Sequence, residues 1–152
     1  MLVQVCVAFG ANLGDAKGAV LQAIADVGGL ANTQLFKASA LYASAPVEAI
    51  GPQFINAVAL YNTDLPPLDL LDALQRLENT AGRERPYLHA PRTLDLDMIW
   101  YGDLTLQSPR LTLPHPRWQQ RAFVLLPLAE ICPELVKNEW LEQVKAQEIA
   151  RL

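Results

Sequence analysis

The order of strand-like and helix-like segments constrains the fold of this chain most. Short apolar runs predict strands, and stretches that repeat apolar residues every three or four positions predict helices. In chain order these are a strand at 3–9, a helix ended by Gly28-Gly29, strands at 35–42 and 54–61, a helix that ends just before Gly82 and a strand ending at Tyr101. This βαββαβ order is typical of ferredoxin-like folds, in which helices pack on a mainly antiparallel sheet. We therefore expect an α+β fold with this core and C-terminal additions, including helices over 121–132 and about 140–149.

Length and composition are those of a single folded domain. The 152 residues are 51% hydrophobic and 18% charged, which suits one domain, 1–152, with one sizeable core. Cys6 and Cys132 both lie in apolar stretches and are expected to be buried free thiols. The N-terminus lacks the features of a signal peptide, and no apolar run approaches the ~20 residues of a membrane span. We expect a cytoplasmic protein without a membrane partner.

The charge distribution points to a small anionic ligand. The net charge is −4, which argues against broad binding to nucleic acid or anionic membranes. Arginines nevertheless crowd the middle of the chain: Arg76, Arg83, Arg85, Arg92, Arg110, Arg117 and Arg121. Arginine suits phosphate and carboxylate groups because its planar fork makes paired hydrogen bonds. Surface ion pairs are an equally good interpretation of this cluster.

Two aspartates interrupt the last strand of the predicted core. Asp95 and Asp97 alternate with apolar residues, so they share one face of the strand, about 7 Å apart. Two carboxylates at this spacing can converge on divalent cations. A half-exposed strand with an acidic outer face is the alternative. We expect the first and last core strands to be central neighbours, and a mid-sheet position favours a metal site over the alternative.

Several stretches together resemble one family. They are Phe9 to Gly14, Phe54 to Val58, Gln75 to Glu78 with Gly82-Arg83, Pro91 to Met98, and Leu111 to His115 followed by Arg121 to Phe123. In this order they strongly resemble the 6-hydroxymethyl-7,8-dihydropterin pyrophosphokinases of folate synthesis. The resemblance implies a ferredoxin-like fold and transfer of the terminal pyrophosphate of MgATP to a pterin hydroxymethyl group, with release of AMP.

The resemblance also implies roles for individual residues. Asp95 and Asp97 match the ligands of two Mg²⁺ ions, and Arg83 and Arg92 match the catalytic arginines. The positions that match ATP contacts are Gln75, Glu78, Arg85, Met98, Arg110, Thr112, His115 and Arg121. Those that match pterin contacts are Ser44, Ala45, Val47, Phe54, Asn56 and Phe123.

Three positions depart from the family pattern: Leu88, His89 and Pro116. They fall on the segment before the acidic strand and on the adenine rim, so we expect altered nucleotide affinity or loop kinetics and retained chemistry. A catalytically impaired pterin- or nucleotide-binding relative is the alternative. An RNA-binding module on the same scaffold is a further one, which the acidic net charge opposes. We expect a monomer that binds small-molecule substrates and no nucleic acid.

Overall fold

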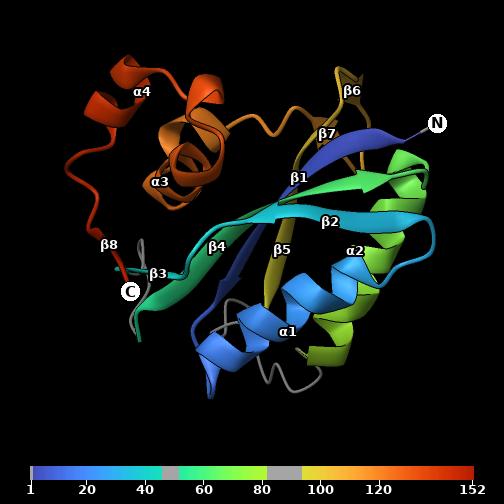
Figure 1. Ribbon diagram of the computed structural model, residues 1–152, viewed down its shortest axis with the longest axis horizontal. Coiled ribbons are helices and arrows are strands. Elements are labelled where there is room, and N and C mark those ends of the chain that lie inside the picture. The colour runs from blue at the N-terminus through green and yellow to red at the C-terminus, as the bar shows by residue number, and fades with distance from the viewer. Residues whose placement is uncertain (1, 46–51, 82–93) are drawn as a thin grey trace.

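An antiparallel sheet forms the centre of the fold in the computed structural model, which describes residues 2–45, 52–81 and 94–152 (Figure 1). The larger elements are β1 (Val3–Ala11), α1 (Ala16–Gly28), β2 (Thr33–Ala38), β3 (Tyr42–Ser44), β4 (Phe54–Thr63), α2 (Pro67–Ala81), β5 (Asp95–Tyr101), α3 (Ala122–Ile131), α4 (Asn138–Gln143) and β8 (Ile149–Arg151). Shorter elements are β6 (Leu106–Gln107), β7 (Thr112–Leu113) and the 3-10 helices η1 (Trp118–Gln120) and η2 (Pro133–Leu135).

The described residues place six strands in the main sheet in the order β5-β1-β4-β3-β8, with β2 also paired to β4. All these pairs are antiparallel. The predicted α+β fold with a βαββαβ core is confirmed, with β1, α1, β2, β4, α2 and β5 as its members.

The expected mid-sheet position of the acidic strand is wrong. Within the part of the chain that the structure describes, β5 lies at the edge of the main sheet and pairs there with β1 alone. The connection through α2 carries the chain from β4 across β1, so β5 joins the far side of β1. The central neighbours are therefore β1 and β4.

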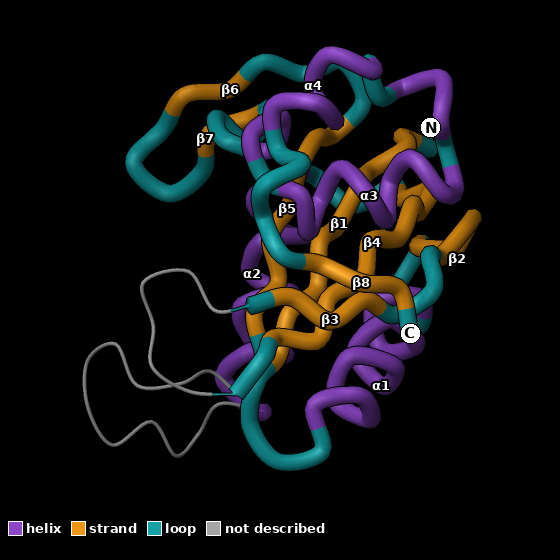
Figure 2. Tube along the Cα trace, turned by 90° about the vertical axis from the view of Figure 1, so that its left-hand side faces the viewer, coloured by secondary structure: helices purple, strands orange, loops and turns teal. Residues whose placement is uncertain are grey.

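Helices cover both faces of the sheet, α1 and α2 on one and α3 on the other (Figures 1 and 2), and a hydrophobic core lies on each face. On one face, Val7 and Phe9 of β1 belong to the core that contains the buried sides of α1 and α2. On the other face, Ala8 of β1 and Val58 of β4 pack with α3. This division follows from the alternation of side chains along a strand. The face that carries Ala8 is the face that carries the site.

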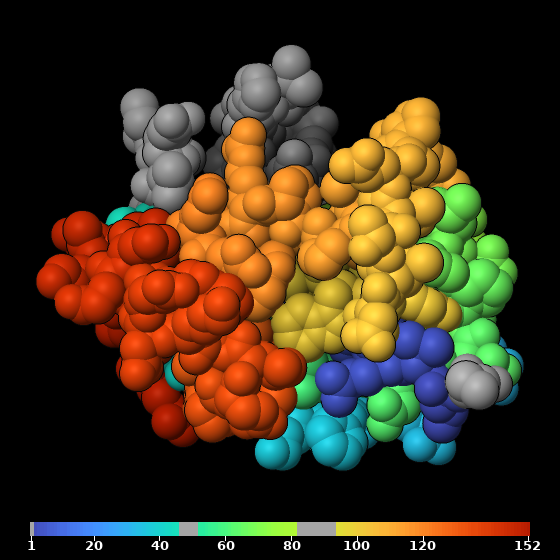
Figure 3. Space-filling view, turned by 90° about the horizontal axis from the view of Figure 1, so that it is seen from above, coloured from blue at the N-terminus to red at the C-terminus, as the bar shows by residue number. Residues whose placement is uncertain are grey.

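Other expected elements differ in detail. The strand predicted at 35–42 is divided into β2 and β3 because the two segments pair with different stretches of β4. The helix predicted over about 140–149 ends at Gln143, and Ile149–Arg151 instead form β8 against β3. Pairing with a distant strand here outweighs local helical spacing. The residues after β5 lie together on one side of the molecular surface (Figure 3).

Cys6 and Cys132 are both free, as expected, but only Cys6 is buried and Cys132 is partly exposed. Burial raises the pKa of the Cys6 thiol well above its ordinary value, so this thiol is protonated and serves as a small core residue. Among the described residues, no helix has the length and apolar character needed to cross a membrane.

Candidate active site

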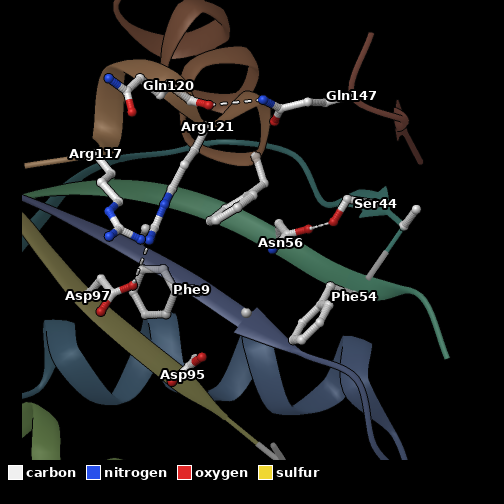
Figure 4. Close-up of a pocket in the computed structure, with 14 residues that line it drawn as sticks. Phe9, Ser44, Phe54, Asn56, Asp95, Asp97, Arg117, Gln120, Arg121 and Gln147 are labelled. Atoms are coloured by element: carbon white, nitrogen blue, oxygen red, sulfur yellow. Dashed lines mark hydrogen bonds and ion pairs between the residues drawn. The ribbon is translucent and has the colours of Figure 1, made fainter. Parts of the chain in front are cut away.

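A cavity of about 510 Å³ opens on the α3 face of the sheet, where β1, β4 and β5 meet η1 and the start of α3 (Figure 4). Strand register explains which side chains reach it. Asp97 lies opposite Ala8 and Asp95 opposite Gly10, so both aspartates share the face that packs against α3. The cavity is lined by Ala8, Phe9, Gly10, Ser44, Ala45, Phe54, Asn56, Asp95, Asp97, Arg117, Gln120, Arg121, Phe123 and Gln147.

Gly10 forms part of the cavity floor. It lies in β1 between Asn56 of β4 and Asp95 of β5. A Cβ atom at Gly10 would stand 3.3 Å from Asn56 Nδ2 and 4.0 Å from Asp95 Cβ. A side chain would therefore occupy the space between the amide and the carboxylate. The predicted first strand ends at residue 9, before Gly10, whereas β1 continues to Ala11.

A hydrogen bond orients the amide of Asn56. The residue is buried, with 4% of its surface exposed, and its Oδ1 accepts a hydrogen bond of 2.5 Å from the Ser44 hydroxyl. The Nδ2 group is consequently directed towards Gly10 and the cavity. This arrangement presents an oriented donor to a ligand bound over the sheet.

Two phenylalanines provide the apolar part of the cavity. Phe54 begins β4 and Phe123 lies in the first turn of α3, and both are partly exposed. The guanidinium carbon of Arg121 lies 5.4 Å from the centre of the Phe123 ring, within cation–π distance. The structure thus brings Phe54, Asn56 and Phe123 to one cavity, as the resemblance implied.

Opposite charges face one another at the other end of the cavity. Arg121 Nη1 lies 3.9 Å from Asp97 Oδ2, with the two side chains 28% and 45% exposed. Arg117 and Asp95 line the same cavity (Figure 4). The described residues contain no group of three or more His, Cys, Asp or Glu side chains that could hold a metal ion. Two carboxylates still suit Mg²⁺, which takes further oxygen ligands from phosphates and water.

His115 lies beside this charged end with a defined tautomer. Its Nδ1 accepts a hydrogen bond of 3.1 Å from the backbone N–H of Arg117. Burial lowers the pKa of His115, Arg121 and Arg117 lower it further, and Asp97 raises it. The neutral ring that this favours carries its proton on Nε2, which is a hydrogen-bond donor.

The predicted ATP contacts on α2 form a second group. Arg110 Nη2 donates to Asp72 Oδ1 at 2.5 Å and to Gln75 Oε1 at 3.2 Å, on the exposed surface of α2. Thr112 is exposed on β7, which lies against β5. Gln75, Arg110, Thr112 and His115 are not among the described residues that line the cavity. Gln75 and Arg110 thus form a group on α2 outside the cavity lining, whereas His115 contacts Arg117 of the lining.

Two other predicted ATP contacts have structural partners. Glu78 accepts the backbone N–H of Leu96 at 2.8 Å. Met98 is 4% exposed and packs in the core beneath the sheet, so only its backbone is available to a nucleotide. Val47, Arg83, Arg85 and Arg92, together with Leu88 and His89, lie outside the described residues. The expectations for them stay predictions.

The structure adds six lining residues that the sequence did not assign to the site: Ala8, Phe9, Gly10, Arg117, Gln120 and Gln147. A glycine within an apolar strand signals a close approach, so Gly10 carried a usable signal. Arg117 belonged to the arginine cluster without a role. Gln120 and Gln147 could not have been found from the sequence. Neither lies in a motif, and only the tertiary fold brings these polar side chains to the cavity.

An acidic pair facing arginines beside aromatic rings, on a ferredoxin-like sheet, suits the class of enzymes that transfer phosphate groups. The model of the family "7,8-dihydro-6-hydroxymethylpterin-pyrophosphokinase (HPPK)" matches residues 6–133. This chain belongs to that family.

Known relatives agree with this assignment. A 2-amino-4-hydroxy-6-hydroxymethyldihydropteridine pyrophosphokinase of Pseudomonas aeruginosa is 46% identical over 136 residues, which are 89% of this chain and 84% of the relative. The enzyme of the same name from Haemophilus influenzae is 42% identical over 139 residues, 89% of this chain and 85% of the relative. The predicted family and its pyrophosphokinase function in folate biosynthesis are thereby confirmed, and no finding favours the impaired relative.

A solved structure shares the fold. The crystal structure of wild-type HPPK-DHPS from Plasmodium falciparum with SDX-DHP matches with a TM-score of 0.67 and 12% identity. The match covers 95% of this chain and 43% of that longer chain. At this identity the likeness concerns the fold alone.

Proposed function

We propose that residues 1–152 act as one domain that transfers the pyrophosphoryl group of ATP to 6-hydroxymethyl-7,8-dihydropterin, with AMP as the second product. The observation that carries this proposal is the cavity itself: an aromatic and amide end meets an end with two carboxylates and two guanidiniums. A flat heteroaromatic acceptor suits the first end, and a magnesium-bound triphosphate suits the second.

At the acceptor end, the pterin ring lies between Phe54 and Phe123. The Asn56 amide, oriented by Ser44, donates to an acceptor on the pterin edge. The backbone of Ser44 and Ala45, and that of Val47 in the undescribed segment, completes this edge. The hydroxymethyl group then points towards Asp95 and Asp97.

At the phosphate end, Asp95 and Asp97 would hold two Mg²⁺ ions. Bound magnesium supplies charge neutralisation and alignment of the phosphate. Arg121 and the Nε2–H of His115 bind phosphate oxygens, as do Arg83 and Arg92. The adenosine part contacts the group on α2 and β7, comprising Gln75, Glu78, Arg110 and Thr112, with Arg85 and the backbone of Met98.

The reaction has a simple balance. The hydroxyl oxygen of the pterin forms a bond to the β-phosphorus of ATP, and the bond from that phosphorus to the α-phosphate oxygen breaks. AMP leaves with the electron pair, and the hydroxyl proton is lost to solvent. The residues of the chain position the reactants and stabilise charge, which suffices for a loose phosphoryl-type transition state.

The test is to mix the protein with MgATP and the hydroxymethyl-dihydropterin and to identify the nucleotide product. Pterin-dependent AMP is expected, and Asp97→Ala is expected to abolish it. Asp103→Ala, at an exposed turn aspartate, is the matched control. ADP as the product contradicts the proposal, and binding of both substrates without turnover supports the impaired relative.

The proposed enzyme acts as a monomer in the cytoplasm on small-molecule substrates alone. Its acidic net charge opposes nucleic-acid binding. Sedimentation velocity at micromolar concentration tests the oligomeric state. A dimer would contradict the monomer proposal without affecting the proposed chemistry.

A further inference from the structure

One side of the cavity is held from the far end of the chain. The side chain of Gln147, between α4 and β8, makes two hydrogen bonds of 2.9 Å at the junction of η1 and α3. Its Oε1 accepts the backbone N–H of Ala122. Its Nε2 donates to the backbone carbonyl of Gln120, the bond dashed in Figure 4. These are the two neighbours of Arg121, so Gln147 bridges the residue that faces Asp97.

The junction needs an outside partner. Arg121 is the N-cap of α3 in an extended conformation, and it makes no side-chain capping hydrogen bond. The first N–H groups of a helix have no partner within the helix. Gln147 supplies an acceptor for the N–H of Ala122. A residue from another segment thus partly caps the N-terminus of α3. The directions of Arg121 and Phe123, on either side of Ala122, depend on this junction.

The same C-terminal segment also holds the opposite side of the cavity. Next to Gln147, the Glu148 carbonyl accepts the N–H of Ala45 at 3.2 Å, and Ile149 pairs with Ser44 in the β3–β8 ladder. Ser44 in turn orients Asn56. Residues 147–149 therefore connect the segment with Arg121 to the segment with Asn56.

We propose that Gln147 is a positioning residue for pterin binding: it sets the spacing between Phe123 and the Ser44–Asn56 pair. The inference rests on the proposed function. Gln147 lies beyond residues 6–133, which the family model matches. Trp118 anchors η1 separately, because its ring contacts Trp100 and Trp140 with centroids 5.7 and 5.3 Å away. Loss of the Gln147 bonds should thus disturb the site more than the fold.

The test variant is Gln147→Met, which keeps the length of the side chain and removes both hydrogen bonds. We expect the Kd and the KM for the pterin to rise about three- to twentyfold, the effect of one or two hydrogen bonds. The KM for ATP should rise less than that for the pterin: Arg121 depends on this junction, but the ATP contacts on α2 do not touch Gln147. Gln147→Glu keeps the acceptor for Ala122. Its Kd for the pterin should lie between the values for the wild type and for Gln147→Met.

Gln143→Met, at an exposed glutamine of α4 outside the cavity lining, is the matched control. Pterin affinity is measured by equilibrium binding with a non-hydrolysable MgATP analogue, so its value does not depend on turnover. Equal pterin affinities for the wild type and Gln147→Met would overturn the inference alone. Equal losses for pterin and ATP, with a lower melting temperature, would overturn it too, because they indicate general loosening. A wild type that releases no AMP would instead contradict the proposed function.

Discussion

The carboxylate of Glu78 accepts the backbone N–H of Leu96 at 2.8 Å, and Leu96 is the residue between Asp95 and Asp97. The bond joins α2 to the strand that carries both aspartates. Because β5 lies at the sheet edge among the described strands, this N–H has no ladder partner on its outer side. Glu78 supplies a partner and thereby fixes the part of β5 from which Asp95 and Asp97 line the cavity.

Glu78→Ala should therefore lower both stability and turnover. We expect a loss of about 1–3 kcal/mol in the free energy of unfolding, since a partly buried N–H loses a charged acceptor. Glu78→Gln keeps an acceptor oxygen and should lose less than half as much. Urea denaturation and AMP release measure the two effects, with Asn79→Ala on the exposed side of α2 as the control. Wild-type stability in Glu78→Ala would show that the bond does not hold β5.

Gly10→Ala should weaken pterin binding with little change in stability. The added methyl group would stand 3.3 Å from Asn56 Nδ2, so the amide must shift by a few tenths of an ångström. A shift of the donor that meets the pterin should raise the KM for pterin about tenfold, the equivalent of about 1.4 kcal/mol. Steady-state kinetics with each substrate varied is the measurement.

Gly29→Ala is the matched control for Gly10→Ala, because a Cβ atom at Gly29 makes only ordinary contacts, the nearest at 3.5 Å. An unchanged KM for pterin in Gly10→Ala would mean that the space at Gly10 is not part of the pterin site.

The neutral state of His115 should appear in the pH dependence of stability. Burial lowers the pKa of this histidine below the ordinary 6.5, so the unfolded chain binds more protons than the folded one below that value. The stabilisation is full above pH 6.5 and is lost as the pH falls towards the lowered folded pKa. Protonation at Nδ1 also removes the acceptor for the N–H of Arg117.

Denaturation between pH 7.5 and pH 5.5 tests this titration. The free energy of unfolding of the wild type should fall over the lower half of this range. That of His115→Asn should fall less, because the amide oxygen of asparagine can accept the N–H of Arg117 and does not titrate. Identical slopes for the two proteins would contradict a neutral, partly buried His115.

Asp72 should tune the affinity for ATP through Arg110. The pair is about half exposed, at 47% and 46%, so its contribution to stability is below about 1 kcal/mol. If Arg110 contacts the triphosphate, Asp72→Asn removes the carboxylate that neutralises the Arg110 guanidinium. The KM for ATP should then fall about two- to fivefold, by analogy with other surface charge pairs. Arg110→Ala should raise it.

The double variant separates this effect from a direct one of Asp72. In the Arg110→Ala background, Asp72→Asn should leave the KM for ATP unchanged, as a double-mutant cycle requires of a pair that acts together. A lower KM in that background would show that Asp72 acts on ATP without Arg110.

The sequence by itself determined the order of the core elements and the shared face of Asp95 and Asp97. Both follow from local periodicity, because alternation along a strand and repetition along a helix depend only on neighbouring residues. The motifs likewise pointed to Phe54, Asn56, Arg121 and Phe123, which the fold brings to one cavity.

Tertiary structure alone decided the rest. The edge position of β5 and the bridge from Gln147 to Gln120 and Ala122 each depend on which distant strands and segments pair. Glu78 is an ordinary helix glutamate until the crossover through α2 brings β5 within its reach. Such contacts join residues far apart in the chain, so local periodicity carries no trace of them.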